Sequence, residues 1–423
     1  MKELSVKNKS LNQSRRSFLK SASLLGGGLI VGIPLNACAT TQNPNPSGDL
    51  RPNALLQIGT DNRVRFYVPR AEMGQGTYTG LSTILAEELD IEPNKIEVIH
   101  AGAHEDFVNP DYGLQVTGGS NSIRAHFSSL RQLGANARLV LRQAAAKTLN
   151  LDIAEIETNN GHIQVRGKSL PYGEFVESAM QLEFPENAAL KKSDTFKYIG
   201  KNAPRLDGLQ KSTGTAQFGI DVEFEGLYRA ALKRCPVFGG TVASFKAEQA
   251  LAMPGVEKVV PIHNGVAVVA KHYYQAKNAL ATIEVNWNTP EKLSKFSSNS
   301  TAPDNGKGFF KTALDSDDSS NAFEQGEGLP ALKNSASQFS AEYWAPYLAH
   351  ATMEPMNCTA KINGDNLDLW VGTQAPDVAK LTGAYYSGID KDNVTVHNTF
   401  LGGGFGRRSG ADFVAEAVAI AKA

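Results

Sequence analysis

Three glycine- and serine-rich turns are the candidate binding sites of this sequence. They are Glu72–Gly76 (EMGQG), Val116–Ser122 (VTGGSNS) and Leu401–Arg408 (LGGGFGRR). Each precedes a stretch with helical spacing of apolar residues, so its bare amides would lie at a helix N-terminus. Glycine runs cost conformational entropy and are typical of places where another group approaches the main chain. The turns therefore predict cradles for an anion or polar cofactor. The alternative is that they are tight turns and helix caps.

Other kinds of site are disfavoured by what the turns and cysteines lack. None of the three turns carries the Gly-Lys-Ser/Thr of a phosphate-binding loop, and the sequence has neither a serine nucleophile elbow nor HExxH. The three cysteines, Cys38, Cys235 and Cys358, do not have metal-type spacing, so we expect no iron–sulfur cluster or structural zinc in this chain. A net charge of −1 gives no indication of nucleic-acid binding.

The N-terminus predicts export. Ser14–Lys20 (SRRSFLK) precedes a weakly apolar run, Leu24–Leu35, which is too short to span a bilayer comfortably. This pattern is typical of a twin-arginine signal, which directs the export of folded proteins that often carry an inserted cofactor. The alternative is a chance arginine pair before a buried helix. Leu35–Cys38 (LNAC) resembles a lipoprotein cleavage box, so Cys38 is a candidate lipid anchor, with ordinary cleavage as the alternative. We expect 1–38 to be the signal and 39–52 a linker.

The remaining chain alternates strand and helix patterns, which predicts a mixed α/β (α+β) fold with ligands at strand ends. We expect a first unit over 53–190, a second over 195–288, a linker over 289–337 and a last unit over 338–423. The predicted elements are strands at 55–58, 63–68, 162–165, 221–233, 256–262, 266–270, 282–287, 339–343, 367–371 and 394–398, with helices at 273–281, 377–386 and 411–423. Hairpin turns are predicted at Asn159–Gly161 and His263–Gly265. Because the last helix pattern stops without a cap or polar tail, we expect the sequence to be an N-terminal fragment.

Six motifs together resemble the large, molybdopterin-binding subunit of the xanthine dehydrogenase/aldehyde oxidase family, closest to the branch of isoquinoline 1-oxidoreductase beta subunits. The resemblance runs from about residue 54 to the end. Its motifs are EMGQG with Ala86–Asp90, Thr117–Ser122 with Leu130 and Arg131, Arg205–Asp207 with Lys211 and Thr213–Gly214, His350–Pro355, Thr373–Pro376, and Gly402–Arg408. It implies that 213–288 form an α/β hammerhead domain beside molybdopterin-binding units.

The resemblance implies roles for individual residues. Gln374, 31 residues before Phe405, resembles the glutamine that hydrogen-bonds an oxygen ligand of molybdenum. The implied binding residues for a molybdenum–molybdopterin cytosine dinucleotide are Gly74, Gln75, Gly76, Gly118, Gly119, Ser120, Ser122, Gly403, Gly404, Phe405, Gly406 and Arg407. The metal itself would be held by pterin sulfurs, so no protein metal ligand is expected.

The family's chemistry is hydroxylation of an N-heterocycle or aldehyde with water-derived oxygen, assisted by a glutamate base. Nothing in this sequence matches that glutamate, and the setting of Glu354 implies a structural or site-lining role. Alone, the chain is therefore expected to be inactive. The implied partners are a small [2Fe–2S] subunit and a cytochrome c or other electron acceptor, in the periplasm.

Two other functions remain open from the sequence. A split or truncated chain would act as a scaffold without catalysis. A periplasmic solute-binding protein would also suit the export signal, but does not need the glycine triplet or Gln374.

Overall fold

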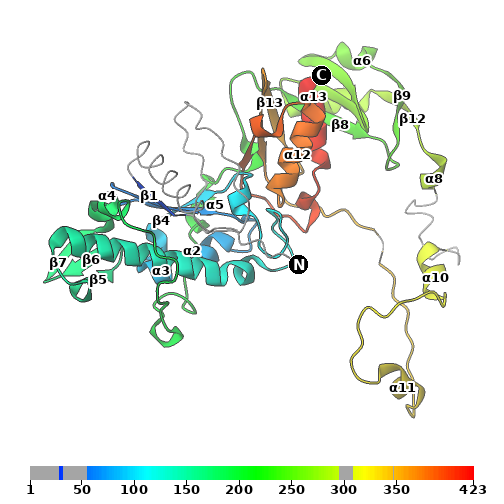
Figure 1. Ribbon diagram of the computed structural model, residues 1–423. Coiled ribbons are helices and arrows are strands. Elements are labelled where there is room, and N and C mark those ends of the chain that lie inside the picture. Colours follow the sequence, from blue (N-terminus) through cyan, green and yellow to red (C-terminus); the bar gives the residue numbers. More distant parts are fainter. Residues whose placement is uncertain (1–27, 32–54, 295–307, 346) are drawn as a thin grey trace, which may run out of the picture. The chain divides into compact units, whose positions relative to one another are not determined.

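The computed structural model describes residues 28–31, 55–294, 308–345 and 347–423 (Figure 1). The twin-arginine motif, the cleavage box at Cys38 and the linker at 39–52 lie outside the described residues. Within the expected signal segment, strand β1 (Gly28–Val31) pairs antiparallel with β2 (Leu56–Gly59). None of the helices in the described ranges has the length and apolar character needed to cross a membrane.

The chain divides into two compact units, and each mixes helices and strands as the sequence predicts. The first unit combines residues up to 223 with residues 352–422, and the second comprises residues 224–351 and residue 423. The domain boundaries expected from the sequence, including the hammerhead, stay predictions.

The first unit contains one order of elements twice: a hairpin, a helix, a strand parallel to the hairpin's second strand, and another helix. The first copy is β2 (Leu56–Gly59), β3 (Val64–Val68), α2 (Thr77–Leu89), β4 (Ile96–His100) and α3 (Ser122–Leu149). The second copy is β13 (Thr359–Asn363), β14 (Asn366–Val371), α12 (Pro376–Ser387), β15 (Val394–Asn398) and α13 (Asp412–Lys422). The hairpins pair antiparallel, whereas β3 with β4 and β14 with β15 pair in parallel. The strands predicted at 55–58, 63–68, 367–371 and 394–398 are confirmed to within a residue.

The same local signals end the first helix of each copy. α2 stops at Asp90 and α12 stops at Gly388, both with left-handed backbone, the conformation that commonly terminates helices. A single 3₁₀ turn follows in each copy, Pro93–Lys95 and Lys391–Asn393, and leads directly into the parallel strand. In both copies the chain therefore returns from the first helix to the parallel strand in the same way.

Close packing fixes α2, the helix that follows the Glu72–Gly76 turn. All but one of its residues are buried, and α3 lies against it. A Cβ on Gly134 of α3 would stand 2.7 Å from the carbonyl oxygen of Leu85, so the backbones of the two helices approach closely there. The apolar side chains of β2, β3 and α2 belong to one core together with α3.

Buried acidic side chains at the end of α2 hold the segment 191–199. The Glu88 carboxylate accepts from Nε and NH2 of Arg131 at 2.9 and 2.7 Å, and from the amide of Lys191. Glu87 accepts from the amides of 197–199. Asp90 accepts from the ammonium groups of Lys191 and Lys197 at 3.1 and 2.8 Å. Because this segment leads to Arg205, the cluster positions that arginine beside the first turn.

The remaining elements of the first unit are short. They are β5 (Glu157–Asn159), β6 (His162–Val165), β7 (Lys168–Pro171), α4 (Val176–Ala179) and α5 (Gly208–Thr213). The hairpin turn predicted at Asn159–Gly161 is confirmed between β5 and β6.

The second unit contains two small antiparallel sheets with helices between their strands. Its elements through residue 288 are β8 (Arg229–Arg234), β9 (Thr241–Lys246), α6 (Glu248–Leu251), β10 (Val256–Ile262), β11 (Gly265–Ala270), α7 (Tyr273–Ala281) and β12 (Glu284–Asn288). The hairpin predicted around His263–Gly265 and the helix predicted at 273–281 are confirmed. The strand predicted over 221–233 begins only at Arg229.

Short helices, and no strand, follow residue 288 in the described part of the second unit. They are α8 (Glu291–Ser294), α10 (Phe309–Leu314) and α11 (Gly328–Lys333). The strand predicted at 339–343 is wrong: those residues belong to no strand in the described ranges, and Phe339 and Tyr343 are exposed. An apolar, alternating pattern cannot form a strand without a neighbouring strand to accept its hydrogen bonds.

Two carboxylate–arginine pairs of the first unit test the structural role of the acidic cluster at the end of α2. We expect Glu88→Ala to lower the free energy of unfolding by about 3–5 kcal/mol, because it leaves the mostly buried side chain of Arg131 without its carboxylate partner. The matched control is Glu155→Ala, whose carboxylate also meets two nitrogens of one arginine, Arg166, but is exposed. The control should cost less than about 1 kcal/mol. Urea unfolding of both variants measures the difference, and equal losses would contradict the account.

Candidate functional site

Every candidate site residue lies on one of four loops that follow the carboxyl ends of the parallel strands, or at the first residue of the helix beyond. Residues 69–76 follow β3, 101–121 follow β4, 372–375 follow β14 and 399–411 follow β15. Ligands of α/β sheets bind outside the carboxyl ends of their strands. The repeated topology of the first unit therefore gathers the three predicted turns and Gln374 on loops of one kind.

One buried carboxylate shapes the Glu72–Gly76 turn. Glu72 Oε1 accepts from the amides of Gly74 and Gly76 at 2.9 and 3.2 Å, and its Oε2 accepts from the amide of Tyr78 at 3.1 Å. Gly74 and Gly76 have φ of 102° and 89°, values that favour glycine. The turn thus wraps around a fully buried acidic side chain, which gives it a single conformation.

Cations balance this carboxylate. Arg205 NH2 lies 3.1 Å from Glu72 Oε1, and Lys211 Nζ lies 3.4 Å from the same atom. Burial alone would raise the pKa of Glu72, but the backbone amides and Lys211 outweigh it and leave the pKa below its usual value. Asp207 pairs with the same two cations. Burial raises its pKa, while hydrogen bonds from Arg205 and Lys211 hold it at about 2.

The side chain of Gln75 is used inside its own turn. Its Oε1 accepts from the amide of Met73 at 2.8 Å, and its Nε2 donates to the carbonyl of Ala71 at 2.9 Å. Both ends of the amide are therefore occupied. Because the amides of Gly74 and Gly76 donate to Glu72, these predicted residues use most of their polar groups within the turn itself.

Thr117 joins three of the four loops. Its amide donates to the carbonyl of Gln374 at 2.7 Å, and its carbonyl accepts from Gln374 Nε2 at 2.9 Å. Its hydroxyl oxygen accepts from the amide of Ala71 at 2.9 Å. Gln374 is held at both its backbone and its side chain by this one residue.

The free end of Gln374 meets the glycine run. Gln374 Oε1 is buried and has no hydrogen-bond partner among the described residues. A Cβ placed on Gly404 would stand 2.7 Å from that oxygen and 2.7 Å from the sulfur of Met73. The turn after β3, the loop after β14 and the loop after β15 therefore converge at Gly404, and only a bare backbone fits there.

A second buried carboxylate holds the glycine run. Glu354 Oε2 accepts from the amide of Gly402 at 2.8 Å, and Oε1 accepts from the amide of Ile220 at 3.1 Å. Arg408 is fully buried and pairs with Glu354 at 3.0 Å, while its Nε donates to the carbonyl of Gly403 at 2.8 Å. The amide of Gln374 donates to the carbonyl of Arg408 at 3.0 Å. These contacts make Glu354 structural, which is one of the two roles that its sequence setting implies.

Some predicted residues lie away from this convergence. Phe405 has a left-handed φ of 50° and a side chain that is 72% exposed. Arg407 makes two hydrogen bonds to the carboxylate of Asp412, at 2.7 and 2.6 Å. Gly119 and Ser120 lie on an exposed turn that leads from Thr117 to the start of α3, with Gly118 and Ser122 partly covered beside them. Gly403 and Gly406, both with positive φ, flank Gly404 in the glycine run.

Apart from Glu354, sequence reasoning did not assign roles to the residues that hold the loops in place. Glu72 stands two and four residues before Gly74 and Gly76, and a carboxylate there can accept hydrogen bonds from loop amides, which was a usable signal. Thr117 holds Gln374 through its main chain, so its identity gave little indication of that contact. The partnership of Glu354 with Arg408 joins residues 54 positions apart in the sequence, which only the fold reveals.

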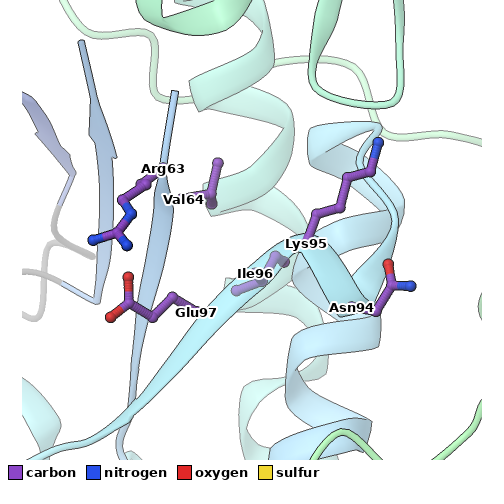
Figure 2. A pocket seen from close by; sticks show the side chains of 6 residues that line it. All are labelled: Arg63, Val64, Asn94, Lys95, Ile96 and Glu97. Atoms are coloured by element: carbon purple, nitrogen blue, oxygen red, sulfur yellow. The ribbon is translucent and has the colours of Figure 1, made fainter. Parts of the chain in front are cut away.

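A shallow hollow lies at the opposite end of the same strands. Figure 2 shows its lining, which comes from the starts of β3 and β4: Arg63, Val64, Asn94, Lys95, Ile96 and Glu97. Because these residues lie at the amino ends of the parallel strands, the hollow is separate from the candidate site.

Comparison with known proteins shows the family of this chain. Two family models, both described as a molybdopterin cofactor-binding domain, match residues 4–224 and 314–423. The chain is 30% identical, over 97% of its length, to the beta subunit of isoquinoline 1-oxidoreductase from Brevundimonas diminuta. It is 26% identical, over 87% of its length, to a nicotinate dehydrogenase subunit of Pseudomonas putida.

The chain spans only part of these relatives. It covers 58% of the isoquinoline oxidoreductase subunit and 31% of the nicotinate dehydrogenase subunit. Among solved structures, an aldehyde oxidoreductase from Desulfovibrio gigas aligns with 59% of this chain and 33% of its own, at 15% identity and a TM-score of 0.38.

Two alanine substitutions in one loop test the convergence at Gly404. We expect Gly404→Ala to displace Gln374 or Met73 and to lower the free energy of unfolding by about 1–3 kcal/mol, the usual cost of overpacking. Gly410→Ala is the matched control, because its φ is −73° and its Cβ would meet no atom closer than 3.5 Å. Chemical unfolding of both variants is the measurement. A Gly404→Ala protein as stable as the control would show that the three loops do not meet there.

Proposed function

This chain belongs to the molybdopterin-binding subunits of the xanthine dehydrogenase family, and on that premise we propose that it forms part of an exported molybdenum hydroxylase. The proposed reaction adds water-derived oxygen to an N-heteroaromatic ring or an aldehyde. The names of the relatives, which include isoquinoline, nicotinate and aldehyde oxidoreductases, support this substrate class. The observation that carries the proposal is the bare cradle where Met73, Gln374 and Gly404 converge.

The residues of the cradle fit a large polar cofactor. A buried amide oxygen without a partner is costly unless a ligand supplies a donor, and Gln374 Oε1 is such an atom in the described part of the chain. Gly404 packs so closely against this oxygen and the sulfur of Met73 that a Cβ would stand 2.7 Å from each, so a side chain there would displace them. When bound, molybdenum–molybdopterin supplies a Lewis-acidic, redox-active centre. We propose its cytosine dinucleotide form, which the resemblance of the 72–76 and 117–122 turns supports.

Gln374 is oriented before any ligand arrives. Because the carbonyl of Thr117 can only accept, the nitrogen of the Gln374 amide faces Thr117 and the oxygen faces the cradle. In this orientation Gln374 accepts a hydrogen bond from a protonated group of a ligand. Donation to an oxygen ligand of the metal, as the resemblance implies, would use the second N–H of the amide, because Thr117 takes one of the two.

Glu354 is not free to act as the base of this reaction. Its Oε1 accepts from Ile220 and Asn357, and its Oε2 accepts from Gly402 and pairs with Arg408. Its role is to hold the glycine run. We propose that the general base is contributed by polypeptide outside the present sequence.

The sequence supports our proposals for the electron-transfer partners and the cellular location of this chain. The structure describes two of the three cysteines, Cys235 and Cys358. Burial raises the pKa of the Cys358 thiol to about 12, so this thiol stays neutral. We propose that electrons pass to a separate small [2Fe–2S] subunit and then to a cytochrome c or another acceptor. The Ser14–Lys20 motif supports periplasmic export by the twin-arginine route, and Leu35–Cys38 supports a lipid anchor at Cys38.

A second candidate function is a non-catalytic scaffold that binds another polypeptide. One observation favours it: the second unit exposes a run of large apolar side chains, each more than two thirds accessible. They are Phe323, Leu329, Phe339, Tyr343, Tyr347 and Leu348. Several exposed apolar side chains in one segment are typical of chain that a partner covers. A scaffold would need this surface but not the cradle.

Cofactor analysis of the protein exported by its own host separates the two functions. We expect molybdenum and cytidine monophosphate, released by acid hydrolysis, in equal amounts to the chain purified with its partners. Gly404→Ala should lose both, because its Cβ occupies the cradle, whereas Gly410→Ala should keep both. Absence of molybdenum and nucleotide from the unaltered chain would contradict the enzyme and favour the scaffold.

A further inference from the structure

Strand β1 (Gly28–Val31) completes the first sheet of the first unit. The sheet has the order β1-β2-β3-β4, so β2 lies between β1 and β3. β1 and β2 pair antiparallel over the whole length of both strands. The register partners are Gly28 with Gly59, Leu29 with Ile58, Ile30 with Gln57 and Val31 with Leu56. Helix α4 (Val176–Ala179), from a distant part of the sequence, also lies close to β1.

β2 has the composition of an interior strand, whereas its counterpart in the second copy has that of an edge strand. The counterpart, β13, is the outer strand of its sheet in the described ranges and carries Lys361 at its centre. Outer strands commonly carry a charge, a proline or a bulge, because their open amides and carbonyls would otherwise pair with another chain. β2, with the sequence LQIG, has no charge or proline, neither of its pairings has a register shift, and all of its residues are buried. β2 is therefore suited to a strand on each side, and β1 takes the side that β3 leaves open.

β1 is also part of the segment expected to act as the export signal. It lies inside the apolar run Leu24–Leu35, between the twin-arginine motif Ser14–Lys20 and the cleavage box Leu35–Cys38. A signal acts on the membrane through its apolar run, and a single strand inserted there could not pair its amides and carbonyls. Residues 28–31 therefore cannot pair with β2 and engage the membrane at the same time.

We propose that the folded first unit holds part of its own export signal as strand β1, so that the paired chain is autoinhibited for export. Export requires β1 to separate from β2, and the export machinery can compete for it because segments near a chain terminus open at low free-energy cost. The pairing belongs to the unprocessed chain, since cleavage before Cys38 would remove residues 1–37 and leave the edge of β2 open. The proposal rests on the proposed function for the export route alone, and the molybdenum site plays no part in it.

An engineered disulfide in the full, unprocessed chain tests the pairing. Ile30→Cys with Gln57→Cys places cysteines at register partners, whose Cα atoms are about 4.5–5.5 Å apart in an antiparallel pair and can be bridged. Ile30→Cys with Arg65→Cys is the matched control. Arg65, on β3, is the register partner of Gln57, so it lies two strand spacings, about 10 Å, from residue 30 and is out of reach.

Both pairs are made with the three native cysteines replaced by serine, which also prevents cleavage at the Cys38 box. Oxidised glutathione should then link the first pair and not the control pair. Peptide mapping by mass spectrometry measures the link. Absence of a disulfide in the first pair, or equal linking of the two pairs, overturns the proposal.

Uptake of the Ile30→Cys/Gln57→Cys protein into inverted membrane vesicles that carry the twin-arginine machinery tests the inhibition. We expect the reduced protein to become protected from external protease and the disulfide-linked protein to stay accessible. The control pair, treated with the same oxidant, should be protected as well as the reduced protein is.

Equal uptake of the linked and the reduced protein overturns the proposal, because β1 would then not need to leave β2. If neither form is taken up, the proposed export and the inhibition both fail, whereas molybdenum in the purified chain would still support the proposed cofactor. If the first pair does not link but the chain is taken up, the proposed export stands and the inhibition fails.

Discussion

Two buried carboxylates hold two of the three glycine-rich loops of this protein in place. A loop of glycines has no side chains with which to pack, so its amides must be organised by a group from elsewhere. The Glu72 carboxylate accepts hydrogen bonds from the amides of Gly74, Gly76 and Tyr78. The Glu354 carboxylate accepts hydrogen bonds from the amides of Ile220 and Gly402. Each is neutralised by an arginine, Arg205 or Arg408. Removing either carboxylate would leave both a loop and a cation without partners.

The repeated topology places these loops together. In both copies a hairpin, a helix and a parallel strand send two loops to the carboxyl ends of the strands. The amide and the carbonyl of Thr117, from the first copy, hydrogen-bond to Gln374 from the second. Gly404 lies against the side-chain oxygen of that glutamine. Rigidity at this point serves binding, because a preorganised cradle loses little freedom when a ligand enters it.

Much of the fold was predictable from the sequence, because periodicity and turn signals act locally. The hairpins at Asn159–Gly161 and His263–Gly265 and the helix at 273–281 follow from such signals. The strand predicted at 339–343 failed because strands need partners, and the sequence does not show where partners lie. The turns and Gln374 were predicted as site residues, but the way they are held was not. Thr117 acts through its backbone, and Arg408 contacts Glu354 across 54 residues.

If the four loops form one cradle for one cofactor, bound cofactor must protect all of them together. Hydrogen–deuterium exchange of the chain with and without bound cofactor measures this protection most directly. The account predicts that cofactor slows exchange together at 72–76, 117–122, 373–375 and 402–406, while the hollow at 94–97 is unchanged. Protection confined to one of the four loops, or found at none of them, would contradict it.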